Sequence, residues 1–138
     1  MKSIIIISIL AGSALLLTSC SDTISSPDNI KSTLMGTWVH DNYSEYNVRI
    51  MRKSQTLKKD NYGFIFYRDG GFVERNINGW CGTPPVAYNN YEGEWVTESD
   101  SLIKITVEYW GGITEYRIKI ISLTRSELKF IHINNERY

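Results

Sequence analysis

The sequence contains few cysteines. Only Cys20 and Cys81 occur among 138 residues, so the chain lacks the disulfide framework that stabilises many small exported domains. Neither cysteine is spaced with a second cysteine or a histidine in the way that zinc ligands are. Glycine-rich phosphate loops and acidic calcium loops are also missing. We therefore expect no metal and no cofactor, and we expect packing alone to stabilise the fold.

The chain also lacks an excess of charge of either sign. It has 15 basic and 15 acidic residues. Proteins that bind nucleic acid usually present a basic stripe or patch, and a strongly charged surface is needed to steer charged ligands over long distances. The composition therefore argues against nucleic acid as a partner.

The sequence shows no convincing set of catalytic residues. A cysteine nucleophile would require Cys81 to lie beside His40 or His132, with a third group to orient the base. These residues fall on distant segments. His132 alternates with Leu128 and Phe130, as a half-buried strand residue does. We therefore expect a protein without enzymatic activity.

No apolar run reaches the ~20 residues that a comfortable transmembrane helix needs. The N-terminal apolar stretch is shorter and ends in Leu17–Cys20, where an aliphatic residue and two small residues precede a cysteine. This pattern is typical of the lipobox of bacterial lipoproteins. It predicts that residues 1–19 are a signal peptide and that Cys20 carries the acyl chains that anchor the protein to a membrane. An uncleaved anchor or an ordinary secretory signal is the alternative.

Residues 20–33 are predicted to be the lipidated cysteine and a flexible tether. The segment is rich in Ser, Thr, Asp, Asn and Pro, and its aliphatic residues are Ile24 and Ile30. Ser21 follows the cysteine in place of the aspartate that often retains lipoproteins in the inner membrane. In a Gram-negative cell this favours the outer membrane, with the protein facing either the periplasm or the cell surface.

The remaining chain, residues 34–138, is predicted to be one all-β domain. Strand-like segments alternate apolar and polar residues, most clearly in Leu102–Trp110 and Ile113–Ile121. Asp69-Gly70 and Gly111-Gly112 supply the backbone freedom that tight hairpins need. Sequential hairpins with one apolar face favour an antiparallel up-and-down meander that closes into an eight-stranded barrel and so removes its edge strands. A β-sandwich is the alternative.

Several bulky aromatic residues fall on the predicted inner face of these strands or on a loop at one barrel end. An eight-stranded barrel has room for its own side chains or for one small ligand. The sequence leaves open whether the interior is solid or holds a pocket. If there is a pocket, the candidate ligand-binding residues are Phe64, Phe66, Trp80, Trp95, Tyr109 and Tyr116.

Several sequence features together resemble the lipocalin-like domain of small lipoproteins of Bacteroidota. They are the opening Leu34–Trp38, the hairpin Tyr67–Phe72, the segment Trp80–Pro85, the triplet Gly93–Trp95 and the terminal run of alternating strands, and the resemblance extends over residues 34–133. It implies an eight-stranded barrel in which Gly36 and Trp38 correspond to the lipocalin G-x-W opening, with Trp38 plugging one end.

In lipocalins an arginine of the last strand packs over this tryptophan. Arg125 precedes the last predicted strand and Arg137 follows it, and neither matches that position. The cation that covers Trp38 is therefore left unassigned by the sequence.

Two functions fit this architecture. The first is a membrane-anchored lipoprotein whose barrel binds a small apolar or amphipathic ligand. The second is a protein-interaction module, such as an accessory subunit, an inhibitor or an immunity-type lipoprotein, with a filled barrel. The loop around Trp80 and the basic residues between Arg49 and Lys59 motivate the second. These basic residues are either a solvated face or a patch for anionic lipid or glycan.

Overall fold

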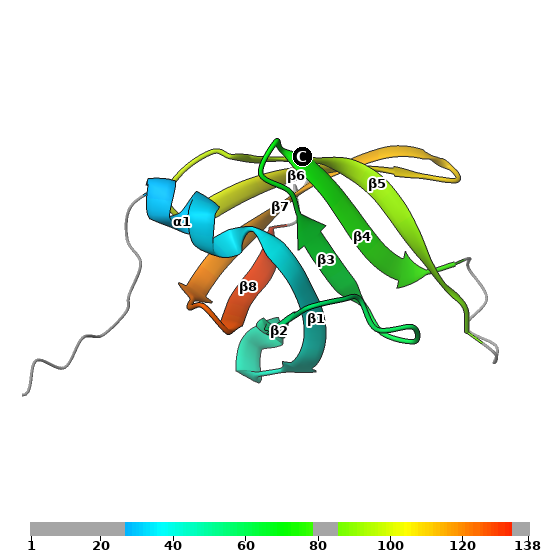
Figure 1. The fold of residues 1–138 in the computed structure, drawn as a ribbon, viewed down its shortest axis with the longest axis horizontal. Coiled ribbons are helices and arrows are strands. Elements are labelled where there is room, and N and C mark those ends of the chain that lie inside the picture. The colour runs from blue at the N-terminus through cyan, green and yellow to red at the C-terminus, as the bar shows by residue number, and fades with distance from the viewer. Residues whose placement is uncertain (1–26, 79–85, 134–138) are drawn as a thin grey trace, which may run out of the picture.

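The computed structural model describes residues 27–78 and 86–133 (Figure 1). Cys20 and the predicted signal peptide lie outside these residues, as do Trp80 and Cys81. The described elements are α1 (Pro27–Leu34), β1 (Gly36–Tyr43), a 3-10 helix (Glu45–Asn47), β2 (Arg49–Ser54), β3 (Gly63–Phe66), β4 (Gly71–Ile77), β5 (Tyr88–Thr97), β6 (Leu102–Tyr109), β7 (Gly112–Leu123) and β8 (Glu127–Ile133).

The strands form one closed antiparallel barrel, which confirms the predicted fold class over the β-sandwich. Their order around the barrel is β1-β2-β8-β7-β6-β5-β4-β3. From β3 to β8 each strand pairs with the next, as a meander predicts. The β1–β2 hairpin departs from a simple meander, in which β2 would pair with β3 and β1 with β8. Here β1 pairs with β3 and β2 pairs with β8.

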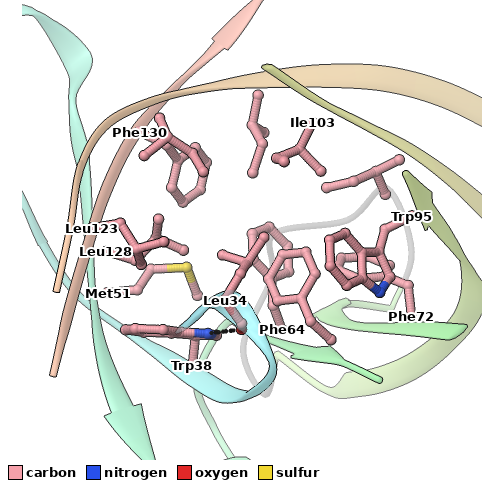
Figure 2. Packing of buried hydrophobic residues seen from close by; sticks show 14 of the residues in the cluster. Leu34, Trp38, Met51, Phe64, Phe72, Trp95, Ile103, Leu123, Leu128 and Phe130 are labelled. Atoms are coloured by element: carbon pink, nitrogen blue, oxygen red, sulfur yellow. Dashed lines mark hydrogen bonds between the residues drawn. The ribbon is translucent and has the colours of Figure 1, made fainter. Parts of the chain in front are cut away.

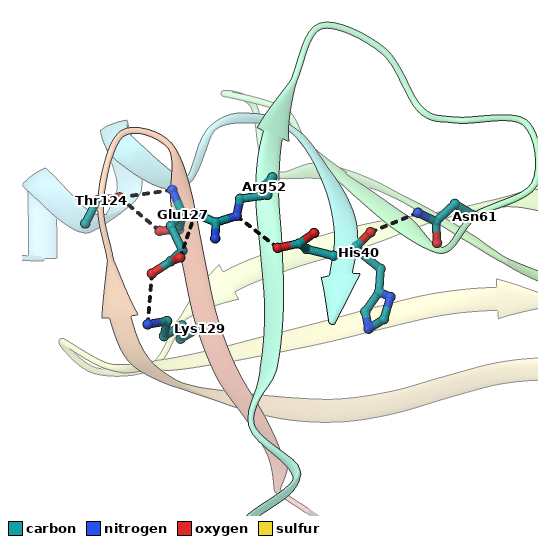
Figure 3. A network of polar contacts seen from close by, with 7 residues as sticks. His40, Arg52, Asn61, Thr124, Glu127 and Lys129 are labelled. Atoms are coloured by element: carbon teal, nitrogen blue, oxygen red, sulfur yellow. Dashed lines mark hydrogen bonds and ion pairs between the residues drawn. The ribbon is translucent and has the colours of Figure 1, made fainter. Parts of the chain in front are cut away.

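This pairing requires the segment between β2 and β3 to cross the outside of β1. Val39 of β1 is buried outside the main core, as expected for a residue that the crossing segment covers. The crossing segment approaches closely, because a Cβ on Gly63 would lie 2.6 Å from the Leu57 side chain. Asn61 fixes the end of the segment by donating from Nδ2 to the His40 carbonyl at 2.8 Å (Figure 3).

The structure corrects the prediction of a flexible tether up to residue 33. Residues 27–34 form α1, from which β1 starts directly (Figure 1). Ile30 and Leu34 are one helical turn apart and therefore lie on the same face, and both are buried in the core. The indole Nε1 of Trp38 donates to the carbonyl of Leu34 at 2.7 Å (Figure 2). The helix thus belongs to the domain and covers the barrel end that contains Trp38.

The half of the barrel nearest α1 is filled with side chains (Figure 2). Phe64 is fully buried, and its ring centroid lies 5.1 to 5.7 Å from those of Phe66, Phe72 and Phe130. Aromatic pairs at such tilted, edge-on separations contribute stability beyond the area they bury. We call this packed half the closed end.

Candidate functional site

The end of the barrel away from α1 contains a cavity of about 450 Å³, which we call the mouth. Small-ligand sites commonly have volumes of about 300–1,000 Å³. The mouth is built from residues near the ends of seven strands and from the segment before β3. It is lined by His40, Tyr43, Arg49, Asn61, Tyr62, Glu74, Asn76, Ile77, Tyr88, Tyr109, Tyr116 and His132.

A buried carboxylate lies in the wall of the mouth. Glu74 is only 3% exposed, because it follows Phe72 at the strand period and so points inward from β4. Its Oε2 accepts hydrogen bonds from the hydroxyls of Tyr109 at 2.7 Å and Tyr116 at 2.8 Å, and its Oε1 accepts one from Asn76 Nδ2 at 3.0 Å. Three donors therefore offset the cost of burying the carboxylate.

The tyrosines around Glu74 remain protonated well above neutral pH. Burial is the main cause that raises the pKa values of Tyr62, Tyr109 and Tyr116, and the nearby negative charge of Glu74 raises them further. Their hydroxyls therefore act as neutral hydrogen-bond donors, and they add no negative charge to the mouth.

Arg49 contributes a cation to the same cavity. Its guanidinium carbon lies 4.1 Å from the Tyr62 ring centroid and 5.1 Å from that of Tyr43, within the range of cation–π contacts. Its Nη2 donates to the Tyr43 hydroxyl at 2.5 Å. Its Nε is buried and has no hydrogen-bond partner among the described residues. The guanidinium thus lies against two aromatic rings, and its Nε donor has no acceptor among the described residues.

Both histidines of the mouth are held in the neutral form. Burial first, and the charge of Arg49 second, lower the pKa of His40 below its usual value and lower that of His132 to about 4. One side of His132 is exposed at the rim, whereas its ring packs against those of Tyr116 and Phe130, with centroids 5.3 Å and 5.4 Å away. This packed side is the burial that lowers its pKa. The Nε2 atom of His40 is buried without a partner among the described residues.

The described part of the chain has neither a metal-binding cluster nor a membrane-spanning helix. No group of three or more His, Cys, Asp or Glu residues within it has a geometry that holds a metal ion. No helix within it is long and apolar enough to cross a membrane.

The structure separates the predicted ligand-binding residues into two groups. Tyr109 and Tyr116 line the mouth. The other described candidates, Phe64, Phe66 and Trp95, are buried in the core and do not line the mouth. Trp95 lines a separate hollow beside the β3–β4 turn. Trp80 lies outside the described residues.

Gly36 and Trp38 both lie at the closed end. Trp38 is fully buried beneath α1. Gly36 begins β1 with a φ of 108°, which favours glycine.

The predicted basic group does not form a single patch. Arg49 points into the mouth, whereas the ammonium of Lys53 points toward α1 and donates to the carbonyl of Thr33 at 3.2 Å. Arg52 lies on the outer wall and forms ion pairs with Asp41 at 3.1 Å and Glu127 at 2.7 Å (Figure 3). Alternation along β2 explains why Arg52 lies on the face opposite to Arg49 and Lys53. Arg49 and Lys53 share the inner face, but they are four residues apart along the strand and therefore lie near opposite ends of the barrel.

The sequence interpretation missed Glu74, Arg49, Tyr62 and His40 as residues of the site. The signal that identifies Glu74 and Arg49 is their position in the strand alternation. Glu74 lies two residues after the buried Phe72, and Arg49 lies two residues before the buried Met51, so both point to the inner face. A charged residue on the apolar face of a strand is unusual unless it has partners. The partners themselves come from other strands and cannot be assigned from alternation.

Comparison with known proteins supports the architecture. The sequence of residues 34–130 matches the family described as lipocalin-like domain. Searches of curated proteins and of solved structures gave no match. The family match covers more than half of the chain and coincides with the barrel. The chain therefore belongs to the lipocalin-like domain family.

Proposed function

We propose that this chain is a lipid-anchored lipoprotein whose barrel binds a small amphipathic ligand in the mouth. The observation that carries the proposal is a cavity of about 450 Å³ whose wall contains two buried polar atoms, Arg49 Nε and His40 Nε2, that have no hydrogen-bond partner among residues 27–78 and 86–133. Buried polar atoms of proteins are nearly always hydrogen-bonded to protein, water or ligand. The proposed role is binding without catalysis.

The wall of the mouth favours an amphipathic ligand over a purely apolar one. Tyr88, Tyr109, Tyr116 and Ile77 offer ring faces and an aliphatic surface, while Arg49 and the histidines offer polar atoms. The filled closed end provides a floor, so the ligand would enter the mouth without reaching Trp38. Sites of this composition orient a ligand through a few polar contacts on a largely apolar surface.

The anchor would be the acylated Cys20, in the outer membrane of a Gram-negative cell. Leu17–Cys20 supports this part of the proposal through its lipobox pattern. The chain from Cys20 to the start of α1 at Pro27 can extend over at most about 25 Å. Since α1 covers the closed end, this short connection would attach there, and the mouth would open at the end opposite to the anchor.

Ligand binding can be tested with a neutral fluorescent probe, 1-aminoanthracene. In the part of the chain that the structure describes, the buried core residues lie between Ile30 and Phe130, so a chain from Ser21 to Tyr138 keeps them all. We expect saturable binding to this chain and loss of binding in Asn76→Phe, which places a ring in the mouth. Val96→Phe adds the same ring at an exposed position of β5 and should bind normally. A probe that binds both variants equally well would contradict the proposed site.

The anchor is tested with the full chain in a Gram-negative host. We expect the protein in the outer-membrane fraction and labelling by a radioactive fatty acid, both lost in Cys20→Ser. Cys81→Ser serves as the matched control and should leave both unchanged. A Cys20→Ser variant that remains in the membrane fraction would overturn the lipid anchor.

A protein-interaction module is the second candidate, and one surface feature favours it. Trp110 and Ile113 flank the β6–β7 turn and are 72% and 73% exposed. Crosslinking in cells that express the full chain, followed by purification, would recover a partner that Trp110→Ser and Ile113→Ser lose. Recovery of no crosslinked partner would remove the support for this function.

A further inference from the structure

The charged groups of the mouth favour one class of ligand head group. This inference rests on the proposed function, since it concerns which ligands the mouth selects. The starting observation is that Arg49 Nε and His40 Nε2 are both buried, both belong to residues of the mouth, and both lack partners among the described residues. A buried donor left without an acceptor destabilises the fold, and a charged donor does so more strongly than a neutral one. A ligand acceptor would remove this destabilisation once the side chains that enclose these atoms shift to admit it.

The carboxylate of Glu74 does not satisfy Arg49. Glu74 accepts its hydrogen bonds from Tyr109, Tyr116 and Asn76, and no ion pair joins it to Arg49 within the described residues. The two charges therefore occupy separate parts of the same cavity. Arg49 is thus a cation of the mouth that pairs with no carboxylate in the part of the chain that the structure describes.

The neighbours of Arg49 do not compete with an anion. Tyr43 and Tyr62 present ring faces to the guanidinium, and Asn61 uses its amide on the His40 carbonyl. The imidazoles of His40 and His132 are neutral because burial and Arg49 lower their pKa values. A neutral imidazole has one nitrogen that can donate, so His40 can add a second hydrogen bond to the same ligand group.

We propose that the mouth selects amphipathic ligands that carry a single carboxylate, which accepts hydrogen bonds from Arg49 and His40. A carboxylate has two acceptor oxygens that suit the forked donors of a guanidinium. A doubly charged head, such as a phosphate monoester, is disfavoured because Glu74 places a second negative charge in the same cavity. The apolar tail would lie against Tyr88, Ile77 and Tyr109.

The test compares head groups on one tail. Dodecanoate, dodecanol, dodecyl phosphate and dodecyltrimethylammonium are titrated into the chain from Ser21 to Tyr138 by calorimetry at pH 7.5. The three charged ligands are kept below their micelle concentrations, and dodecanol is kept below its solubility limit. We expect dodecanoate to bind about tenfold or more tightly than dodecanol, because a hydrogen bond to a buried charge commonly contributes this much. Dodecyl phosphate and the ammonium ligand should bind more weakly than dodecanoate.

Variants locate the preference at Arg49. Arg49→Met keeps the aliphatic stem and removes the charge, so dodecanoate should lose its advantage while dodecanol keeps its affinity. Arg52→Met is the matched control on the outer wall and should preserve the full preference. Arg49→Lys keeps the charge without the fork and should retain part of the preference. If a variant does not fold, the head-group series on the unaltered chain still tests whether the mouth prefers a carboxylate.

Each result has a defined meaning. Equal affinities for dodecanoate and dodecanol would overturn the carboxylate inference and leave a general amphipathic site standing. Tightest binding of dodecyl phosphate or of the ammonium ligand would also overturn it. If none of the four ligands and no 1-aminoanthracene binds, water satisfies the buried atoms, and the proposed function falls together with the inference.

Discussion

The ammonium of Lys53 lies 4.2 Å from the ring centroid of Trp38. The same ammonium donates hydrogen bonds to the carbonyls of Thr33 and Met35, where α1 ends. Cations stabilise helix C-termini because the last carbonyls carry partial negative charge. Lys53 therefore joins β2, α1 and Trp38. Family resemblance implied a cation over Trp38 from an arginine near the last strand, and β2 supplies the cation instead.

Replacing this lysine tests its contribution. Lys53→Met retains most of the aliphatic stem and removes the charge, the cation–π contact and the two hydrogen bonds. We expect the free energy of unfolding to fall by about 1–2 kcal/mol, measured by urea denaturation with tryptophan fluorescence. Lys58→Met, at an exposed position, is the control. Equal midpoints for the two variants would contradict the role of Lys53.

The barrel could be predicted from local patterns, but its closure could not. Alternation in β6 and β7 identifies Ile103, Ile105 and Ile118 as inward residues, and all three are fully buried. Alternation does not say which strand closes the barrel against β8. The segment between β2 and β3 is long enough to cross β1, and the strand pairing together with the packing of Leu57 beside Gly63 shows that it does.

The missed helix has a similar explanation. Ile30 and Leu34 are the residues through which α1 enters the core, and one helical turn is too short to give a clear period. The surrounding Ser, Thr, Asp and Asn residues favour turns and caps as well as flexible chain. The contact that identifies the helix, between the indole of Trp38 and the Leu34 carbonyl, is tertiary.

Removing the apolar contact of α1 tests whether the helix belongs to the domain. Ile30→Ala should lower the free energy of unfolding by about 2 kcal/mol or more, as truncation of a buried isoleucine does. Asn29→Ala, at an exposed position of the same helix, is the control. If α1 were a detachable tether, both substitutions would leave the urea midpoint unchanged.

The hydrogen bonds of Glu74 predict an energetic coupling across the mouth. Glu74→Gln removes a charged acceptor and Tyr116→Phe removes its donor, and each should cost about 1–3 kcal/mol of unfolding free energy. The double variant should cost less than the sum, because both substitutions break the same bond. Glu92→Gln, at an exposed position of β5, should show no coupling to Tyr116→Phe. Additive effects of Glu74→Gln and Tyr116→Phe would show that the two groups act independently.

The depressed pKa of His132 predicts that acid weakens the fold before the carboxylates titrate. In the folded protein the pKa of His132 is about 4, whereas an unfolded histidine has a pKa near about 6.5. Between these values the unfolded chain binds a proton that the folded chain does not bind, so the free energy of unfolding falls as the pH is lowered. Solvent at the exposed rim reduces the size of this effect.

The measurement is the urea midpoint between pH 7.5 and pH 5.0, a range that lies above the ordinary pKa values of Asp and Glu. His132→Gln should flatten the dependence, because the proton that the unfolded chain gains is removed. The pKa of His40 is lowered as well, so His40→Gln should flatten it further, and the double variant should be nearly independent of pH over this range. An unchanged slope in both single variants would show that the histidines of the mouth are protonated normally, and it would remove the argument that Arg49 and burial keep them neutral.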